Sequence, residues 1–144
     1  MYRVKVYVDR SPIHGLGVFA GEDIKKGEVV WEMVRGFDRV YTQAEYESFP
    51  EQARKYLDTY AYWDGEGIHL CGDQGIYTNH SETPNVGSVA EWPDPGSDYE
   101  YALRDIAKGE EITSDYRVFD DISKHDFKKV LGVVLTKNRM KKAA

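Results

Sequence analysis

The chain has 144 residues, of which 41% are hydrophobic and 31% charged, and its formal net charge is −6. This composition is typical of a globular domain rather than a disordered or membrane protein, and the longest apolar runs are far shorter than a membrane span. The negative charge argues against general nucleic-acid binding, because phosphates repel an acidic surface, whereas a basic substrate would be attracted. The N-terminus has no apolar secretion signal, so we expect a cytoplasmic protein.

Cysteine and histidine usage limits the chemistry that the chain can perform. Cys71 is the only cysteine, which excludes an intramolecular disulfide and a cysteine-based zinc cluster. The four histidines show no paired or HExxH-like spacing. We therefore expect no metal site.

The first third of the chain predicts strands and turns. Val4, Val6 and Val8 alternate with polar residues, as in a strand with one buried face. A turn at Ser11-Pro12 leads to a glycine-containing segment, after which the chain becomes extended again. Residues 28–34 are rich in β-forming side chains and predict a further strand.

Two helix-start signals follow. Thr42-Gln43-Ala44-Glu45 and Ser48-Phe49-Pro50-Glu51 both match the capping box, in which a hydroxyl and a glutamate satisfy free backbone donors. In the second, Pro50 would occupy a first helical position, where its missing N–H costs nothing. The pattern predicts two short helices at about 43–48 and 50–58.

The remaining elements are short. Strands are predicted at 60–64, 67–71, 86–92, 99–103 and 112–115, and a helix at 122–132. Many short strands with a few helices, and no internal repeat, predict an α+β fold of several small sheets. The length suits a single domain.

Three segments contain residues that suggest a site: Ser-Pro-Ile-His-Gly-Leu-Gly-Val-Phe-Ala at 11–20, Asn-His-Ser-Glu-Thr-Pro-Asn at 79–85, and Gly-Glu-Glu-Ile-Thr-Ser-Asp-Tyr at 109–116. Each alone also fits an ordinary turn or loop. The Gly-Leu-Gly run lets backbone approach a ligand, but neither a Rossmann nor a P-loop pattern follows it. Glu110 and Glu111 look like paired acids, although a solvated turn is the favoured interpretation.

The order of these three segments resembles that of the SET-domain protein lysine methyltransferases, over roughly residues 3–119. The resemblance implies a β-clip-like fold in which the Asn79-His80 segment and the C-terminal segment cross in a knot-like arrangement. One SET domain would occupy 1–144, with a C-terminal helix and basic tail at 120–144. This minimal member lacks the cysteine-rich zinc module of many relatives, and a homodimer is one way to complete its pocket.

The resemblance also implies a reaction, the transfer of a methyl group from S-adenosylmethionine to the ε-amine of a protein lysine, leaving S-adenosylhomocysteine. Tyr116 would be the catalytic residue that orients the amine, and it would also contact the cofactor. The other predicted cofactor-binding residues are His14, Gly15, Leu16, Gly17, Asn79, His80 and Phe119.

A lysine channel with aromatic walls is expected, because an alkyl stem with a cationic head suits aromatic rings. Tyr77, Tyr62 and Trp92 are the candidates, with core packing as the alternative for each. No side-chain base is evident, so we expect a desolvated lysine to lose its proton to water. The partner would be a basic protein or peptide, with neither nucleic acid nor membrane bound.

Three residues depart from the family pattern: Ile76 stands where many relatives have arginine, Glu82 replaces a common cysteine, and Ser114 replaces a common aromatic residue. The last change alters the surroundings of Tyr116 and leaves the methylation state open. Two other functions also remain open. One is a non-catalytic SET-like module that binds a basic peptide, and the other is a methyltransferase that acts on a small amine.

Overall fold

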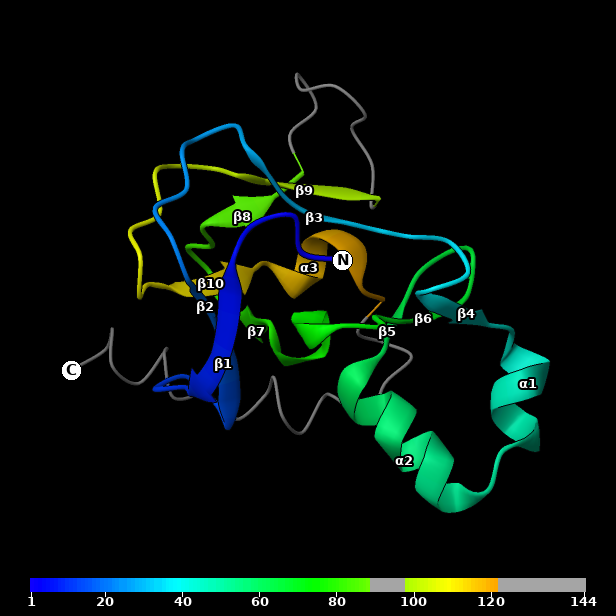
Figure 1. The fold of residues 1–144 in the computed structure, drawn as a ribbon. Helices are drawn as coiled ribbons and strands as arrows, with labels where there is room; N and C mark the ends of the chain where they lie inside the picture. The colour runs from blue at the N-terminus through cyan, green and yellow to red at the C-terminus, as the bar shows by residue number, and fades with distance from the viewer. Residues whose placement is uncertain (89–97, 122–144) are drawn as a thin grey trace.

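The computed structural model describes residues 1–88 and 98–121, which form three small β-sheets and a few short helices (Figure 1). The elements in chain order are β1 (Val6–Arg10), β2 (Leu16–Ala20), β3 (Val29–Glu32), β4 (Arg39–Tyr41), α1 (Gln43–Ser48), α2 (Glu51–Tyr60), β5 (Tyr62–Trp63), β6 (Ile68–Leu70), the 3-10 helix η1 (Gln74–Tyr77), β7 (Asn79–His80), β8 (Val86–Gly87), β9 (Tyr99–Ala102), β10 (Glu111–Ser114) and α3 (Tyr116–Phe119). The predicted α+β class is confirmed.

The three sheets have the strand orders β1-β2-β10-β7, β3-β9-β8 and β4-β6-β5. The alternation at the N-terminus is seen in the β1–β2 hairpin, where Val6 and Val8 are more buried than Tyr7. In Figure 1, α1 and α2 lie beside the β4-β6-β5 sheet, while α3 lies near the centre of the molecule. Helices α1 and α2 thus lie to one side, whereas α3 lies among the strands.

The hydrophobic core has two parts. The larger joins the first two sheets and consists of Val18, Ala20, Ile24, Val30, Val86, Ala102, Ile106 and Ile112. The smaller packs α2 against the third sheet through Leu57, Ala61, Trp63 and Ile68. Burying these side chains stabilises the packing of the first two sheets on each other and of α2 on the third sheet.

The helix-start predictions had different outcomes. At α1 the capping box is present, with Thr42 Oγ1 accepting from the Glu45 backbone N–H at 3.2 Å and the Glu45 carboxylate accepting from the Thr42 backbone N–H at 2.7 Å. The second capping box was wrong. Ser48 is the last residue of α1, and its hydroxyl donates to the Glu45 carbonyl, so it does not cap α2. The N-cap of α2 is Pro50, and no side chain caps this helix.

Residues 81–85 cross the end of β10. The Ser81 N–H donates to the Ser114 carbonyl at 3.0 Å, and the Asn85 N–H donates to the Thr113 carbonyl at 3.2 Å. Further on, the Asp121 N–H reaches the Trp63 carbonyl. The chain from β10 onwards therefore contacts segments that are distant in sequence, which is compatible with the predicted crossing. The predicted helix at 122–132 and the end of the strand predicted at 86–92 lie outside the described residues.

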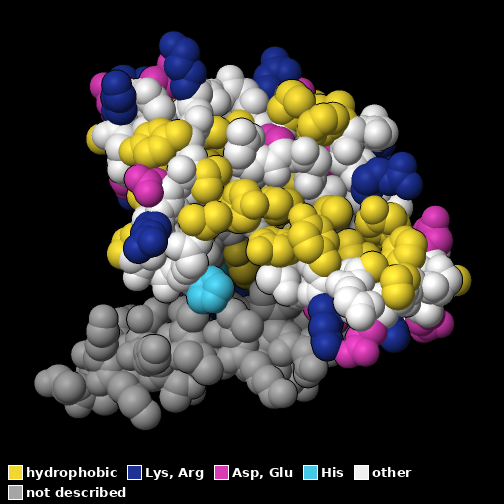
Figure 2. Space-filling view, turned by 60° about the horizontal axis from the view of Figure 1, so that its bottom comes forward, with side chains coloured by type: hydrophobic (Ala, Val, Ile, Leu, Met, Phe, Trp, Pro, Cys, Tyr) yellow, Lys and Arg dark blue, Asp and Glu magenta, His cyan; other side chains and the backbone are white. Residues whose placement is uncertain are grey.

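Hydrophobic side chains form a broad band across one face, with lysine, arginine and acidic side chains interspersed around it (Figure 2). The exposed hydrophobic residues include Leu16, Tyr56 and Val118. Because both basic and acidic side chains surround the band in Figure 2, the charge on this face is mixed rather than of one sign. Within residues 1–88 and 98–121, no helix is both long and apolar enough to cross a membrane.

Candidate active site

Strand β10 brings the three sequence motifs together. It pairs antiparallel with β2, where Ile112 faces Val18, and parallel with β7, where Thr113 faces Asn79. A residue in the middle of a sheet satisfies its backbone groups on both sides, so this register fixes both neighbours at once. The glycine segment and the Asn79-His80 segment therefore flank the strand that leads to Tyr116.

Asn79 and Glu111 form a polar node among the motifs. The Asn79 side-chain amide lies 3.1 Å from the His14 carbonyl, 2.9 Å from the Leu16 carbonyl and 2.8 Å from Glu111 Oε1. The same Glu111 oxygen accepts from the Ser11 hydroxyl at 2.7 Å. The expectation that Glu111 sits in a solvated turn was therefore wrong, because its carboxylate is taken up by partners from the other two motifs.

The two glycines of the first motif are needed for different structural reasons. Gly15 has a φ of +50°, in the left-handed region that favours glycine. A β-carbon at Gly17 would overlap the Glu111 carboxylate and lie 3.0 Å from the Ser11 β-carbon. Gly17 is thus required by the polar node, whether or not a ligand also approaches its backbone.

His80 presents a buried donor. Its Nδ1 accepts the Tyr116 backbone N–H at 3.1 Å. Burial lowers the pKa of this imidazole, against the opposing effect of the nearby Asp115 carboxylate. A neutral ring that accepts at Nδ1 carries its proton on Nε2. His80 Nε2 is buried and has no hydrogen-bond partner in the described part of the chain, so its N–H is an unsatisfied donor.

Tyr116 begins α3, directly after the N-cap Asp115. Its hydroxyl donates to the Thr78 carbonyl, and its ring lies 5.4 Å from His80 and 5.8 Å from Phe119, measured between ring centroids. Burial raises the pKa of this phenol well above its ordinary value. Tyr116 therefore remains a neutral, oriented phenol at physiological pH.

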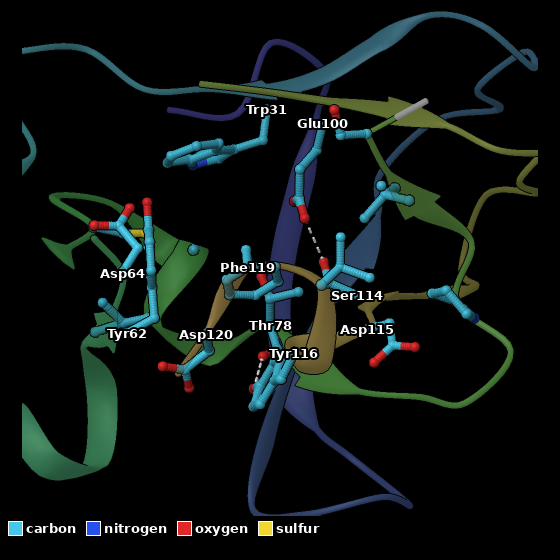
Figure 3. Close-up of a pocket in the computed structure, with 18 of the residues that line it drawn as sticks. Trp31, Tyr62, Asp64, Thr78, Glu100, Ser114, Asp115, Tyr116, Phe119 and Asp120 are labelled. Carbon is cyan, nitrogen blue, oxygen red and sulfur yellow. Dashed lines mark hydrogen bonds between the residues drawn. The ribbon is translucent and has the colours of Figure 1, made fainter. Parts of the chain in front are cut away.

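Tyr116 lines a cavity of about 590 Å³ (Figure 3). Its aromatic wall is made of Trp31, Tyr60, Tyr62, Tyr99, Tyr116 and Phe119. Four carboxyl groups also line it: Asp64, Glu100, Asp115 and Asp120. No lysine, arginine or histidine is among the lining residues that the structure describes. Aromatic faces with carboxylates and without cations suit a positively charged ligand.

Glu100 is one of several lining residues that were not predicted from the sequence, together with Trp31, Asp64, Asp115 and Asp120. It lies on β9, the middle strand of its sheet, and points into the cavity, where Ser114 Oγ donates to its Oε1 at 2.8 Å (Figure 3). Burial raises the pKa of its carboxyl, partly offset by the Ser114 hydrogen bond and the N-terminal ammonium. The available signal was a charged residue within a predicted strand, Tyr99–Leu103, where such residues are disfavoured.

The predicted site residues fall into three groups. Tyr116, Phe119 and Tyr62 line the cavity. The backbone of the predicted glycine segment is tied to Asn79, and His80 to Tyr116, but these residues lie outside the lining of the cavity: His14, Gly15, Leu16, Gly17, Asn79 and His80.

The remaining channel candidates lie elsewhere. Tyr77 is not a lining residue; its ring contacts Tyr60 at 6.0 Å and packs against the larger core. Trp92 lies outside the described residues. Of the departures from the family pattern, Ile76 and Ser114 line the cavity, whereas Glu82 lies 3.7 Å from Arg117 in an ion pair.

Comparison with known proteins agrees with this geometry. The SET domain family model matches residues 15–117. Human histone-lysine N-methyltransferase 2D is 31% identical over 124 residues, and the Drosophila melanogaster histone-lysine N-methyltransferase trr is 33% identical over 122 residues; these cover 83% and 81% of this chain. The chain spans only 2% and 5% of the length of these two curated relatives.

Solved structures show the same fold. A Plasmodium falciparum candidate histone methyltransferase is 30% identical with a TM-score of 0.56, covering 79% of this chain and 94% of that one. The Chaetomium thermophilum Polycomb Repressive Complex 2 bound to S-adenosylmethionine has a TM-score of 0.59 at 24% identity, covering 94% of this chain and 17% of that one, which supports the fold alone. With the family model, the relatives and the fold in agreement, the chain belongs to the SET domain family.

Proposed function

We propose that this chain transfers a methyl group from S-adenosylmethionine to the ε-amine of a lysine in a protein substrate. The observation that carries the proposal is the cavity beside Tyr116, which has aromatic and carboxylate walls and no cationic side chain among its described lining residues. A sulfonium cofactor and a lysine ammonium are both cations that such walls favour. The names of the relatives, histone-lysine N-methyltransferases, support the same reaction class.

The residues present fit the cofactor. The buried Nε2–H of His80 is a donor without a partner among the described residues, and Phe119 lines the adjacent cavity. We assign cofactor binding to His14, Gly15, Leu16, Gly17, Asn79, His80, Tyr116 and Phe119. When bound, S-adenosylmethionine would supply an electrophilic methyl group on a positively charged sulfur.

Tyr116 would act by position rather than by titration. Its neutral phenol is fixed by the Thr78 carbonyl and by ring contacts on two sides, so it costs little reorganisation during reaction. The aromatic rings around it would leave little room for water once a substrate is bound, which would strengthen polar interactions inside the cavity. Tyr62 extends the same wall, with its ring 5.1 Å from Phe119, and would contact the lysine stem.

We infer a basic protein as the substrate. Both the acidic cavity and the net charge of −6 favour a cationic partner. Core histones are therefore the first substrates to assay, as the names of the relatives also suggest. A small amine and a non-catalytic peptide-binding role are the competing outcomes.

The test compares wild type with Tyr116→Phe, using methyl-labelled S-adenosylmethionine and core histones. We expect the variant to bind cofactor normally in calorimetry and to lose about 100-fold in kcat, the scale for one preorganised polar group. Tyr7→Phe is the matched control, because Tyr7 is 43% exposed on β1 and does not line the cavity. Cofactor binding without transfer to histones or to any protein of a host lysate would instead favour the binding module.

A further inference from the structure

Glu100 is a charged residue on the middle strand of a sheet, where the formation of the strand does not require a carboxyl group. β9 lies between β3 and β8, and its other residues are two tyrosines and an alanine. Its carboxyl group turns into the cavity beside Trp31 and toward Ser114 (Figure 3). A carboxylate removed from bulk water is costly unless it is paired, so this placement weakens the fold unless a ligand compensates it.

Two other carboxylates of the cavity are matched by cations or backbone donors. Asp64 Oδ1 accepts backbone N–H groups from Glu66 and Gly67 and lies 2.9 Å from His69 Nε2. Asp115 is held by the Arg117 guanidinium through contacts of 2.8 and 2.6 Å. The pKa of Asp115 is lowered by this pairing, so the carboxylate is already stabilised by the protein.

The other two carboxyl groups of the cavity, Asp120 and Glu100, differ in the partners that they have within the fold. Asp120 is buried and accepts the Trp63 backbone N–H at 2.8 Å, which ties α3 to β5. Glu100 Oε1 accepts the neutral Ser114 hydroxyl, and within residues 1–88 and 98–121 no lysine, arginine or histidine side chain pairs with it. The N-terminal ammonium lowers the pKa of Glu100, but its ion pair is with Asp38, at 3.9 Å. Of the four, Glu100 is the carboxyl with capacity left for a cation from outside.

We propose that Glu100 receives the ammonium group of the amine substrate in this cavity and accepts its proton, with Ser114 as the residue that positions the carboxylate. The assignment rests on the proposed function and adds a side-chain base to it. It replaces our expectation from the sequence that the lysine loses its proton to water alone.

The proton step balances within the pair. One N–H bond of the ammonium breaks, its electron pair stays on nitrogen, and an O–H bond forms on the Glu100 carboxylate. The neutral amine can then act as a nucleophile, and the carboxylic acid returns its proton to solvent after the product leaves. The raised pKa of Glu100 makes its carboxylate a stronger base than an exposed one, while the Ser114 hydroxyl keeps the charged form accessible.

The first test is a pH–rate profile of wild type and Glu100→Gln on core histones. Glutamine keeps the shape and can still accept the Ser114 hydroxyl, so the fold should survive; thermal unfolding checks this. We expect kcat to fall about 100-fold, at the low end of the range for general base catalysis, with loss of the limb that rises with pH. Glu51→Gln is the matched control, because Glu51 is exposed at the start of α2 and pairs with Lys55.

Ser114→Ala separates a base from a structural residue. Without the hydroxyl the Glu100 carboxylate is less stabilised, so its pKa should rise further and the activity limb should move to higher pH. A merely structural role would lower the rate without moving the limb. An unchanged rate and pH profile in Glu100→Gln would overturn the proposal.

A second test does not depend on methyl transfer. The probe is n-butylamine, which carries the end of a lysine side chain, titrated by calorimetry in two buffers of different ionisation enthalpy. Wild type should bind it with proton release below the pKa of Glu100, and Glu100→Gln should bind it about 10-fold more weakly without that release. Equal binding by both proteins would overturn the proposal. Glu100-dependent binding without any methyl transfer would sustain it while the methyltransferase function failed.

Discussion

Two glutamates of the same fold behave in opposite ways. Glu111 accepts the Ser11 hydroxyl and the Asn79 amide, and thereby ties the three motifs together. Glu100 accepts one serine hydroxyl at the edge of a cavity lined by aromatic rings. The Ser11 hydroxyl and the Asn79 amide both bind Glu111 Oε1, while its buried Oε2 has no hydrogen-bond partner in the described part of the chain; Glu100 instead faces the cavity, where a ligand can reach it. The contrast separates residues that build the site from a residue that works in it.

Asn79→Ala tests whether the polar node of Asn79 and Glu111 stabilises the fold. The substitution removes the amide that donates to the part-buried oxygens of Glu111, His14 and Leu16 and leaves a gap beside β10. We expect the free energy of unfolding to fall by about 3 kcal/mol, since unsatisfied buried polar groups are costly. Urea denaturation measures the loss. The control is Gln43→Ala, which removes an exposed amide on α1. A loss below about 0.5 kcal/mol, the ordinary surface range, would mean that the node is not structural.

Gly17→Ala tests the same node from the other side. The added β-carbon meets the Glu111 carboxylate and Ser11, so we expect a loss of about 2 kcal/mol in unfolding free energy from overpacking. Because the clash is with the glutamate side chain, the loss should be much smaller when it is introduced into a Glu111→Ala background. Simple additivity in this double-mutant cycle would contradict the contact.

Glu100→Gln should have the smallest effect on stability, and it should be a gain. The pKa of Glu100 is raised above its ordinary value of 4.5, so the folded state holds this proton more tightly than the unfolded chain. That contribution is fully present below pH 4.5 and is lost as the pH rises through the folded pKa. The variant should therefore gain stability over wild type as the pH rises through this window. Urea midpoints from pH 4 to 8 measure the difference, and a constant difference would mean that Glu100 does not titrate this way.

The order of the motifs indicated which segments lie together in the fold. Tyr116, Phe119 and Tyr62 line one cavity, and the glycine segment lies against Asn79. The first capping box at Thr42 was also predicted correctly, because both of its partners lie within four residues. Local and ordered patterns carry this information directly in the sequence.

What the sequence did not predict depends on distant partners. Glu111 lies in a segment that looks like a solvated turn, and only the folded sheet shows Ser11 beside it. Ser48 matched a capping pattern but ends the preceding helix, a choice decided by the three-dimensional course of the chain. Glu100 belongs to no motif, and only the folded structure shows that it lines the cavity.

The hydrogen bond from Ser11 to Glu111 joins residues that are 100 positions apart. Such a contact forms only after a long loop has closed, which is a slow event and one of the last to be rewarded in folding. The hairpin with β1 can hold the glycine segment earlier, but its second neighbour, β10, is present only after most of the chain has been made. The three motifs should therefore come together late in folding, and activity should appear in step with the pairing of β10.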